Sequence, residues 1–515
     1  MKALLINKYD QVTLLFILMK ISMHLLTNSN YELHRDELLY FNMAGHLSFG
    51  YATVPPMTAF VAFTAKMLFG YSVSGIRLFP AVAGAMTILI MAKIIKKMGA
   101  GIPALIIASV SFLLSPGFLL FDTLLTPNVF EHLLWLLVLW FLLRMMTEDR
   151  PALWIPTGII LGIAFMFKYS VLFLMAGLFI AFMAGQYRKF LNTRYFLSAI
   201  LAGVLIVTPN LIWQYLHNWP VVNHMEELSS TQLTGMTPAV FLTDLLSLNL
   251  ASTVVWVTGL VSLLFLRDER RYRFFGIASL GIILLFIMLN GKGYYALGVI
   301  PFLFAAGGYA MEKYLKGKLI ILRNTVMVLV IAVSLPALPT GLPLLSFDKY
   351  MEYRERTGFL RIYPFFRWED GEIHKLSQVY ADMTGWSELA GYTATAYYML
   401  PADQRESCTV YAESNYGYAG AINFYGREHD LPEAVTFHES YIFWAPDTIP
   451  DGPVIYLSPE INGMNDLFED VTEVGSVHDP YFREAGLKVY LCKDPFTDVQ
   501  EVYRMRSATE KDNYR

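Results

Sequence analysis

The sequence is poor in charge. Asp, Glu, Lys and Arg make up only 16% of its 515 residues, and the net charge is −4. Soluble domains carry about 25% charged residues, so this composition excludes an ordinary soluble protein. No stretch has the density of basic residues that nucleic acids require, which excludes DNA and RNA as partners. In place of charge the chain has 55% hydrophobic and 15% aromatic residues, so we expect a membrane protein.

The N-terminal segment lacks the small-residue cleavage site that ends a secretory signal peptide. Two lysines precede an apolar stretch, as they would in a signal peptide. Without a cleavage site, we interpret Val12 to Leu26 as a membrane span that is retained.

Apolar runs of membrane-spanning length recur to about residue 341. Lys and Arg cluster in alternate loops between these runs, and the positive-inside rule assigns those loops to the cytoplasm. The other loops and everything after residue 341 are therefore expected on the opposite side. With a length criterion of about 20 residues, we predict about eleven transmembrane helices, near residues 12–28, 74–92, 102–120, 127–143, 152–167, 170–185, 196–216, 241–266, 274–290, 294–311 and 319–340.

One apolar segment, Pro55 to Gly70, is too short for a crossing. Counting it as a span would also reverse all later loops against their charge. We interpret it as a helix at the membrane surface, together with the amphipathic stretch from Asp36 to Phe49.

The composition changes after Leu345, where charged and turn residues return. We therefore expect a membrane domain over 1–345 and an extracytoplasmic α/β domain over 346–515. Strand patterns fall at 407–412, 453–457 and 487–492, and helical patterns at 371–383 and 417–425. The only two cysteines, Cys408 and Cys492, lie on strands that could be neighbours, so a disulfide and two buried free thiols both stay open.

Five charged side chains stand at the predicted outer ends of spans or in the outer loops: Asp36, Glu37, Asp122, Lys168 and Lys292. Charge at these depths is costly unless it is paired or lines a wet cavity. Carboxylates can accept a proton, and lysines can hold a phosphate. The set suits glycosyl transfer from a lipid-linked sugar, in which cations stabilise the departing phosphate and a carboxylate deprotonates the acceptor hydroxyl.

Simpler interpretations of these residues stay open. A lysine at the end of a span often extends to the lipid head groups, and Asp122 could cap a helix. Lys20 and His24, four residues apart within the first span, lie on one helical face. Lys20 could hold the lipid phosphate from below. We favour a pairing with a buried acidic residue, because Lys20 is too deep to reach the membrane surface easily.

The order of several motifs resembles that of glycosyltransferase family 39 and its aminoarabinose-transferase relatives, which are membrane enzymes of the GT-C class. The motifs are Asp36-Glu37, Tyr51 with Pro55-Pro56, Gly75 to Pro80 with Arg77, Asp122, Gly162 to Lys168, Lys292 to Pro301, Asn415 to Gly426 and His438 to Pro446. The last two look like segments that are common in bacterial members. Each motif is loose by itself, but together they cover most of the chain.

The resemblance implies a polyprenyl-phosphate sugar as donor, inversion at the sugar, and a site on the extracytoplasmic side of the bacterial inner membrane. The acceptor would be a hydroxyl of a glycan, a lipid or a protein. The resemblance suggests Asp36, Glu37 and Asp122 as catalytic residues, Lys168 and Lys292 as phosphate-binding cations, and Tyr294, Tyr295 and Arg77 as further substrate-binding residues.

The chain departs from the aminoarabinose transferases at Thr53-Val-Pro-Pro56, where they carry Glu-Lys before the two prolines. No cofactor is therefore assigned, and the involvement of a divalent metal ion stays open. The outer residues His46, His217, His224 and Glu226 match no compact ligand motif, and we interpret them as polar loop residues.

A polytopic transporter or flippase of a lipid-linked sugar is the alternative function. Transporters place their sites near the middle of the membrane, whereas these charges gather at one surface. The sugar, the acceptor and the oligomeric state cannot be read from the sequence.

Overall fold

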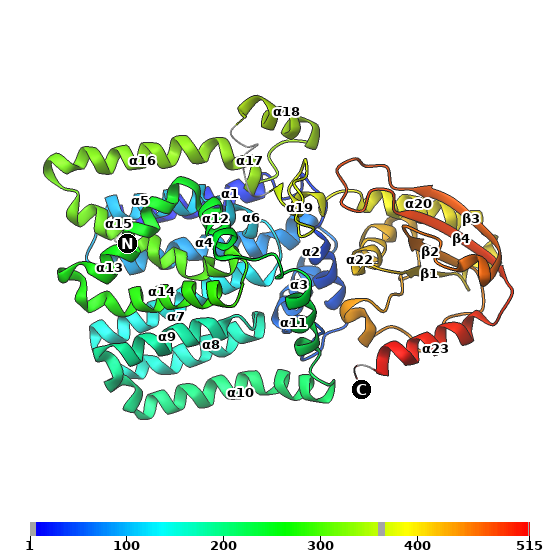
Figure 1. The fold of residues 1–515 in the computed structure, drawn as a ribbon, viewed down its shortest axis with the longest axis horizontal. Helices are drawn as coiled ribbons and strands as arrows, with labels where there is room; N and C mark the ends of the chain where they lie inside the picture. The colour runs from blue at the N-terminus through cyan, green and yellow to red at the C-terminus, as the bar shows by residue number, and fades with distance from the viewer. Residues whose placement is uncertain (1–6, 359–365, 513, 515) are drawn as a thin grey trace, which may run out of the picture. The chain divides into compact units, whose positions relative to one another are not determined.

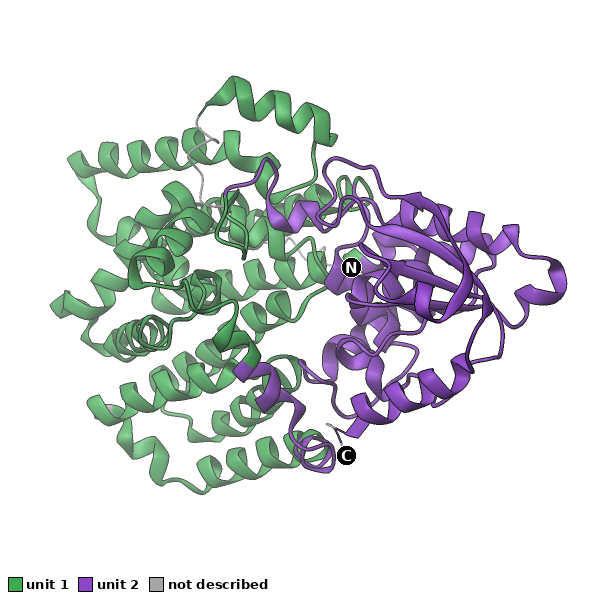
Figure 2. Cartoon of the chain, turned by 45° about the vertical axis from the view of Figure 1, so that its right-hand side comes forward, with its two compact units in different colours: residues 1–30, 77–210, 227–372 green, residues 31–76, 211–226, 373–515 purple. Residues whose placement is uncertain are grey.

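The computed structural model describes residues 7–358, 366–512 and 514. Its contacts divide the chain into two compact units (Figure 2). Unit 1 consists of Met1–Asn30, Arg77–Asn210 and Glu227–Glu372. Unit 2 consists of Tyr31–Ile76, Leu211–Glu226 and Ile373–Arg515, so it combines the C-terminal part with two segments from the N-terminal half. The domain boundary at residue 345 was expected from composition and stays a prediction.

Every apolar run in the predicted set is helical (Figure 1). Seven helical segments in the described part are long and apolar enough to cross a membrane: Val73–Met98, Pro127–Glu148, Arg194–Leu216, Pro238–Phe265, Arg267–Met288, Gly293–Tyr314 and Gly317–Gly341. Their α-helices are α4 (Val73–Met98), α7 (Pro127–Glu148), α10 (Arg194–Leu216), α12 (Pro238–Asn249), α13 (Thr253–Phe265), α14 (Arg273–Met288), α15 (Ile300–Tyr314), α16 (Ile320–Ser334) and α17 (Leu338–Gly341).

The other predicted spans form helices that are not among these seven segments, so eleven crossings stay a prediction. They are α1 (Lys8–Leu25), α5 (Ile102–Leu114), α6 (Pro116–Phe121), α8 (Trp154–Phe167) and α9 (Val171–Ala184). The run expected at 102–120 is divided because Pro116 lacks the backbone N–H that would continue α5.

Close helix packing in unit 1 depends on glycine. A Cβ atom added to Gly259 of α13 would lie 2.2 Å from the carbonyl oxygen of Leu303 in α15. A Cβ atom on Gly307 of α15 would lie 2.0 Å from the carbonyl oxygen of Val255. Small residues let membrane helices approach until their backbones touch. These two glycines therefore hold α13 and α15 together.

Unit 2 contains the two short helices expected after the first span, α2 (Arg35–Met43) and α3 (Met57–Phe69). With 13 residues, α3 is about 20 Å long, which is shorter than the hydrocarbon core of a bilayer. The unit also contains five helices from the C-terminal part: α19 (Gln378–Ala381), α20 (Trp386–Met399), α21 (Ala402–Arg405), α22 (Tyr416–Tyr425) and α23 (Val499–Asp512).

The sheet of unit 2 has four strands in the order β1-β2-β4-β3 (Figure 1). They are β1 (Thr409–Ala412), β2 (Val454–Ser458), β3 (Phe468–Ser476) and β4 (Lys488–Pro495). β1 and β2 are parallel, whereas β4 runs antiparallel to both of its neighbours. Three strands were expected, and β3 was missed.

Two expectations about the C-terminal part are corrected. The helical pattern at 371–383 yields only the one-turn α19, because Gly371 adopts a turn conformation with φ +86° and Ser377 caps the helix. The strands that carry the cysteines are not neighbours either, since β2 lies between β1 and β4. Cys408 and Cys492 are free and buried, and burial raises the pKa of both thiols to about 12.

Candidate functional site

Asp36 lies in the first turn of α2 in unit 2. His34 caps this helix, because its Nδ1 accepts a hydrogen bond from the backbone N–H of Asp36 at 3.0 Å. The Asp36 side chain is 35% exposed. Its Oδ1 accepts a 2.7 Å hydrogen bond from the hydroxyl of Tyr416 at the start of α22. A carboxylate that is both accessible and held in one orientation can serve as a general base.

Tyr416 is itself held in place. The guanidinium of Arg35 lies 5.2 Å from the centre of the Tyr416 ring, in cation–π contact. Burial raises the pKa of Tyr416 well above its ordinary value, and the negative charge of Asp36 adds to the shift. The phenol therefore remains a hydrogen-bond donor to Asp36 at physiological pH.

Glu37 is buried, unlike its neighbour Asp36. Its Oε2 accepts a hydrogen bond of 2.9 Å from the backbone N–H of His34, which completes a capping box at the start of α2. This contact gives Glu37 a role in forming the helix. A catalytic role for Glu37 stays a prediction.

Sequence reasoning missed Glu439, a second carboxylate of unit 2. Its side chain accepts hydrogen bonds from the Thr53 hydroxyl and from the backbone N–H of Ser440. Burial raises the pKa of Glu439, and the charge of Asp36 contributes to the rise. Glu439 also has φ +58°, a left-handed conformation that is uncommon for a residue with a side chain and that concentrates at functional sites.

Asp122 of unit 1 forms an ion pair of 2.6 Å with Lys20, and both side chains are buried. Gly84 leaves room for this pair, since a Cβ atom there would lie 2.4 Å from Oδ2 of Asp122. The expected acidic partner of Lys20 is thus found. His24 is buried beside the pair, with Nδ1 3.1 Å from Oγ1 of Thr123. A catalytic role for Asp122 stays a prediction.

Lys168 ends α8 in unit 1 and lies among polar and aromatic groups. Its Nζ donates hydrogen bonds to Oδ1 of Asn128 at 2.5 Å and to Oε2 of Glu131 at 3.1 Å. The same Nζ lies 5.4 Å from the ring centre of Tyr294 and 5.1 Å from that of Tyr295. The fold thus brings together three of the predicted substrate-binding residues. We call Lys168, Asn128, Glu131, Tyr294 and Tyr295 the Lys168 cluster.

Lys292 has a different set of partners. Its Nζ donates to Oε1 of Gln232 at 2.6 Å and to Oε1 of Glu369 at 2.9 Å. The Lys292 side chain is 17% exposed and the Glu369 side chain 30%. Lys292 is therefore an ion-paired cation that solvent still reaches.

Arg77, near the start of α4, is fully buried. One of its guanidinium nitrogens donates a 2.6 Å hydrogen bond to the carbonyl oxygen of Asn28, and Nδ2 of Asn28 donates to the carbonyl oxygen of Arg77 at 3.2 Å. These reciprocal bonds connect α4 to the chain just after α1. The contacts are structural, and substrate binding by Arg77 stays a prediction.

No group of three or more His, Cys, Asp and Glu side chains in the described ranges could hold a metal ion. Two of the histidines considered as possible ligands stack on tryptophan rings. His46 stacks on Trp444 at 4.7 Å, and His217 stacks on Trp213 at 4.1 Å. A metal ion stays unassigned.

Comparisons with known proteins give a partial sequence match and a broad structural one. Residues 53–213, less than half of the chain, match the model of a family described as dolichyl-phosphate-mannose-protein mannosyltransferase. No curated protein matches the sequence.

The solved structures cover nearly the whole chain. ArnT from Cupriavidus metallidurans is similar in its apo state, with a TM-score of 0.62, and bound to undecaprenyl phosphate, with a TM-score of 0.61. The identities are 16% and 15%, and each match covers 94% of this chain and 98% of that chain. The arabinofuranosyltransferase AftD from Mycobacteria matches with a TM-score of 0.53 and 12% identity, over 95% of this chain and 40% of that chain. At such identities the likeness is one of fold.

Proposed function

We propose that this chain, a multi-pass membrane protein with the GT-C fold of ArnT, is a glycosyltransferase. In this proposal it moves a sugar from a polyprenyl-phosphate donor to an acceptor hydroxyl, with inversion at the anomeric carbon. The observation that carries the proposal is the Lys168 cluster, in which an oriented ammonium group lies against two tyrosine rings. The ArnT structure bound to undecaprenyl phosphate supports a polyprenyl-phosphate ligand.

The donor half of the reaction needs positive charge. When the bond between the anomeric carbon and the phosphate oxygen breaks, negative charge collects on the departing polyprenyl phosphate. We assign its stabilisation to Lys168, with Lys292 as a second cation. Asn128 orients the Lys168 ammonium by accepting one of its hydrogen bonds, and oriented charge stabilises a transition state without further rearrangement. Tyr294 and Tyr295 would line the donor pocket.

The acceptor half needs a base. We assign this role to Asp36, which takes the proton of the acceptor hydroxyl while the hydroxyl oxygen bonds to the anomeric carbon. Attack on the face opposite the phosphate inverts the sugar. The products are the glycosylated acceptor, free polyprenyl phosphate and a protonated Asp36, so atoms and charge balance. Glu37 and Asp122 are proposed as further catalytic acidic residues.

We place the reaction on the extracytoplasmic side of the bacterial inner membrane. The alternate loops rich in Lys and Arg support this orientation through the positive-inside rule. In the same proposal, residues 346–515 form an extracytoplasmic domain, and the acceptor is a glycolipid, a glycan or a protein hydroxyl.

Reconstitution tests the reaction class. The full chain in liposomes would be given polyprenyl-phosphate sugars from a cell-envelope extract, and the lipid products would be separated. The proposal predicts cleavage to polyprenyl phosphate with a sugar on a new carrier. Movement of the intact lipid-linked sugar across the bilayer, without cleavage, would instead identify a flippase.

A further inference from the structure

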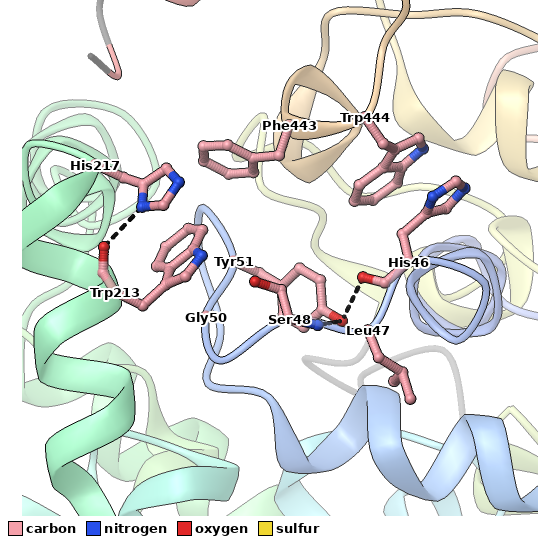
Figure 3. A pocket seen from close by; sticks show the side chains of 9 residues that line it. All are labelled: His46, Leu47, Ser48, Gly50, Tyr51, Trp213, His217, Phe443 and Trp444. Carbon is pink, nitrogen blue, oxygen red and sulfur yellow. Dashed lines mark hydrogen bonds between the residues drawn. The ribbon is translucent and has the colours of Figure 1, made fainter.

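Unit 2 contains an aromatic pocket of about 260 Å³ (Figure 3). Three segments supply its walls: the loop after α2 with His46 and Tyr51, the C-terminal end of α10 with Trp213 and His217, and the chain around Phe443 and Trp444. Nothing in the proposed transfer reaction uses these residues. Rings surround the open space on several sides in Figure 3.

The rings form two stacked pairs. The Trp213 and His217 rings are 4.1 Å apart and inclined by 18°, and the His46 and Trp444 rings are 4.7 Å apart and inclined by 4°. Phe443 meets the first pair edge-on, at 5.0 Å from Trp213 and 5.4 Å from His217. Each ring is thus fixed by a neighbour, so the walls exist before any ligand arrives.

The loop after α2 packs closely against α10 at this pocket. A Cβ atom added to Gly50 would lie 2.2 Å from Cε3 of Trp213, so the indole packs directly on a position that only glycine leaves open. The Tyr51 hydroxyl accepts from the N–H of Ser48 at 3.2 Å and donates to the carbonyl oxygen of His46 at 3.0 Å. Nε2 of Gln214 donates to the carbonyl oxygen of Tyr51 at 3.2 Å, which ties the loop to α10.

Polar groups accompany the aromatic faces. Nδ1 of His217 lies 2.8 Å from the carbonyl oxygen of Trp213, so Nδ1 is the donor in this hydrogen bond. Nε2 of His46 lies 3.5 Å from Oε1 of Glu433. Hydrogen bonding by His46 lowers the pKa of Glu433, which keeps a carboxylate acceptor beside the pocket.

We propose that this pocket binds a pyranose ring. The C–H groups on one face of such a ring carry slight positive charge and pack well on the negative face of an indole or phenyl ring, while its hydroxyls need donors and acceptors at the edge. The pocket offers both. Its volume is somewhat below the range of about 300–1,000 Å³ for drug-sized ligands, which suits one monosaccharide.

An acyl chain fits the pocket less well. Leu47 is the only aliphatic side chain among the pocket's lining residues. A hydrocarbon chain would also offer no hydrogen bonds to the two histidines and to Glu433 beside His46. The inference that a sugar binds stands on this geometry. Its link to turnover rests on the proposed transferase function, and the ring could belong to the acceptor or to the donor.

The binding test uses the full chain in nanodiscs and its tryptophan fluorescence, to which Trp213 and Trp444 of the pocket contribute. Neutral methyl pyranosides (mannoside, glucoside and galactoside) are titrated, with sorbitol as an open-chain control. We expect a saturable change with at least one pyranoside and none with sorbitol. Gly50→Ala, which displaces Trp213, should weaken binding about tenfold, or roughly 1.4 kcal/mol.

Gly391→Ala is the matched control, because a Cβ atom there meets nothing within 4 Å. It should leave the titration unchanged. The proposal is overturned if no pyranoside gives a saturable change, if sorbitol acts equally, or if Gly50→Ala binds as wild type does. A response to polyprenyl phosphate alone would also overturn it, by identifying a lipid site.

A transfer assay distinguishes the two sources of the ring. A higher KM for the acceptor in Gly50→Ala, with the KM for the donor unchanged, would assign the pocket to an acceptor sugar, and the reverse result would assign it to the donor sugar. Unchanged values for both would overturn the link to turnover. If wild type transfers no sugar, the proposed function fails, whereas the binding titration still decides whether the pocket holds a pyranose.

Discussion

The hydroxyl of Tyr416 donates a hydrogen bond of 2.7 Å to the Asp36 carboxylate, across 380 residues of sequence. The two residues begin different helices, α22 and α2, within unit 2. A hydrogen bond to a carboxylate favours its ionised form and fixes its direction. The proposed base is therefore positioned by the C-terminal part of the chain.

Replacing Tyr416 with Phe removes this hydrogen bond and little else. We expect kcat to fall about tenfold to hundredfold, since a hydrogen bond to a charged group contributes roughly 1.5–3 kcal/mol. The acid limb of the pH–rate profile should move to higher pH, because the ionised form of Asp36 loses a stabilising donor. The measurement is kcat against pH for the variant and the wild type.

Tyr418→Phe is the matched control for Tyr416→Phe. Tyr418 lies two residues further along α22, and its hydroxyl donates to Glu484 instead. Its loss should leave the pH profile in place. If both variants shift the profile equally, Tyr416 does not act through Asp36.

Removing the charge of Lys168 should weaken donor binding. For Lys168→Met we expect the KM for a polyprenyl-phosphate sugar to rise about tenfold to a hundredfold, the loss of one charged hydrogen bond to phosphate. Glu131→Gln should act in the opposite direction and lower that KM, because it removes a negative charge that now pairs with Lys168 at 3.1 Å. Steady-state kinetics measures both.

An exposed lysine provides the control for Lys168. Lys189 pairs with Asp149 at 2.7 Å, but both side chains are mostly exposed. Such pairs contribute little, so Lys189→Ala should leave the donor KM unchanged. A donor KM in Lys168→Met equal to that of wild type would remove Lys168 from phosphate binding.

The buried pair of Lys20 and Asp122 allows folding to be separated from chemistry. Lys20→Met alone leaves a buried carboxylate without its partner and should destabilise the fold by about 3–5 kcal/mol. Lys20→Met combined with Asp122→Leu removes both charges and should restore most of that stability. Thermal unfolding in detergent compares the variants.

Activity of the double variant then tests the proposed role of Asp122. The proposal expects a folded protein without transfer activity. A folded and fully active double variant would show that Asp122 serves only as the partner of Lys20.

Glu439 should make stability depend on pH. Burial raises its pKa in the folded state, so folding favours the protonated form. At a pH above the raised pKa of the folded state, the ionised Glu439 carboxylate therefore destabilises the fold. This destabilisation disappears as the pH falls from the folded-state pKa to the ordinary pKa of a glutamic acid. Glu439→Gln should raise the Tm at neutral pH and have a smaller effect in mild acid.

Glu433, also in unit 2, should have the opposite effect on the pH dependence of stability. The hydrogen bond from His46 lowers its pKa, so folding favours the ionised form. Glu433→Gln should therefore lower the Tm slightly at neutral pH, since the Glu433 side chain is 64% exposed and solvent weakens the interaction. The difference should vanish as the pH falls through the lowered pKa of the folded state. Equal pH trends for the Glu439 and Glu433 variants would contradict both assignments.

The local sequence was sufficient to predict the helices of the apolar runs. Each apolar run from 12–28 to 319–340 forms helix, because hydropathy and periodicity act over neighbouring residues. The strand β3 was not predicted, because its central residues are only partly buried and its apolar and polar residues alternate only weakly. The expected helix at 371–383 failed because turn and cap residues, Gly371 and Ser377, overrode the pattern.

The candidate site was less accessible to sequence reasoning. Lys168, Tyr294 and Tyr295 could be chosen by residue type and position, but their assembly depends on tertiary packing. Tyr416 and Glu439 were missed because nothing near them in the sequence points to Asp36 or Thr53. The partner of Lys20 was foreseen as an acid, since a deep lysine requires one. That this acid is Asp122 required the fold.

The most direct test compares wild type with Asp36→Asn in liposomes. The measured quantity is the release of polyprenyl phosphate coupled to sugar transfer, with thermal unfolding as the check on folding. We predict a loss of about a hundredfold to ten-thousandfold in the variant, the usual contribution of a general base, with an unchanged Tm. A folded Asp36→Asn variant that transfers sugar as fast as wild type would contradict the assignment of Asp36 as the base.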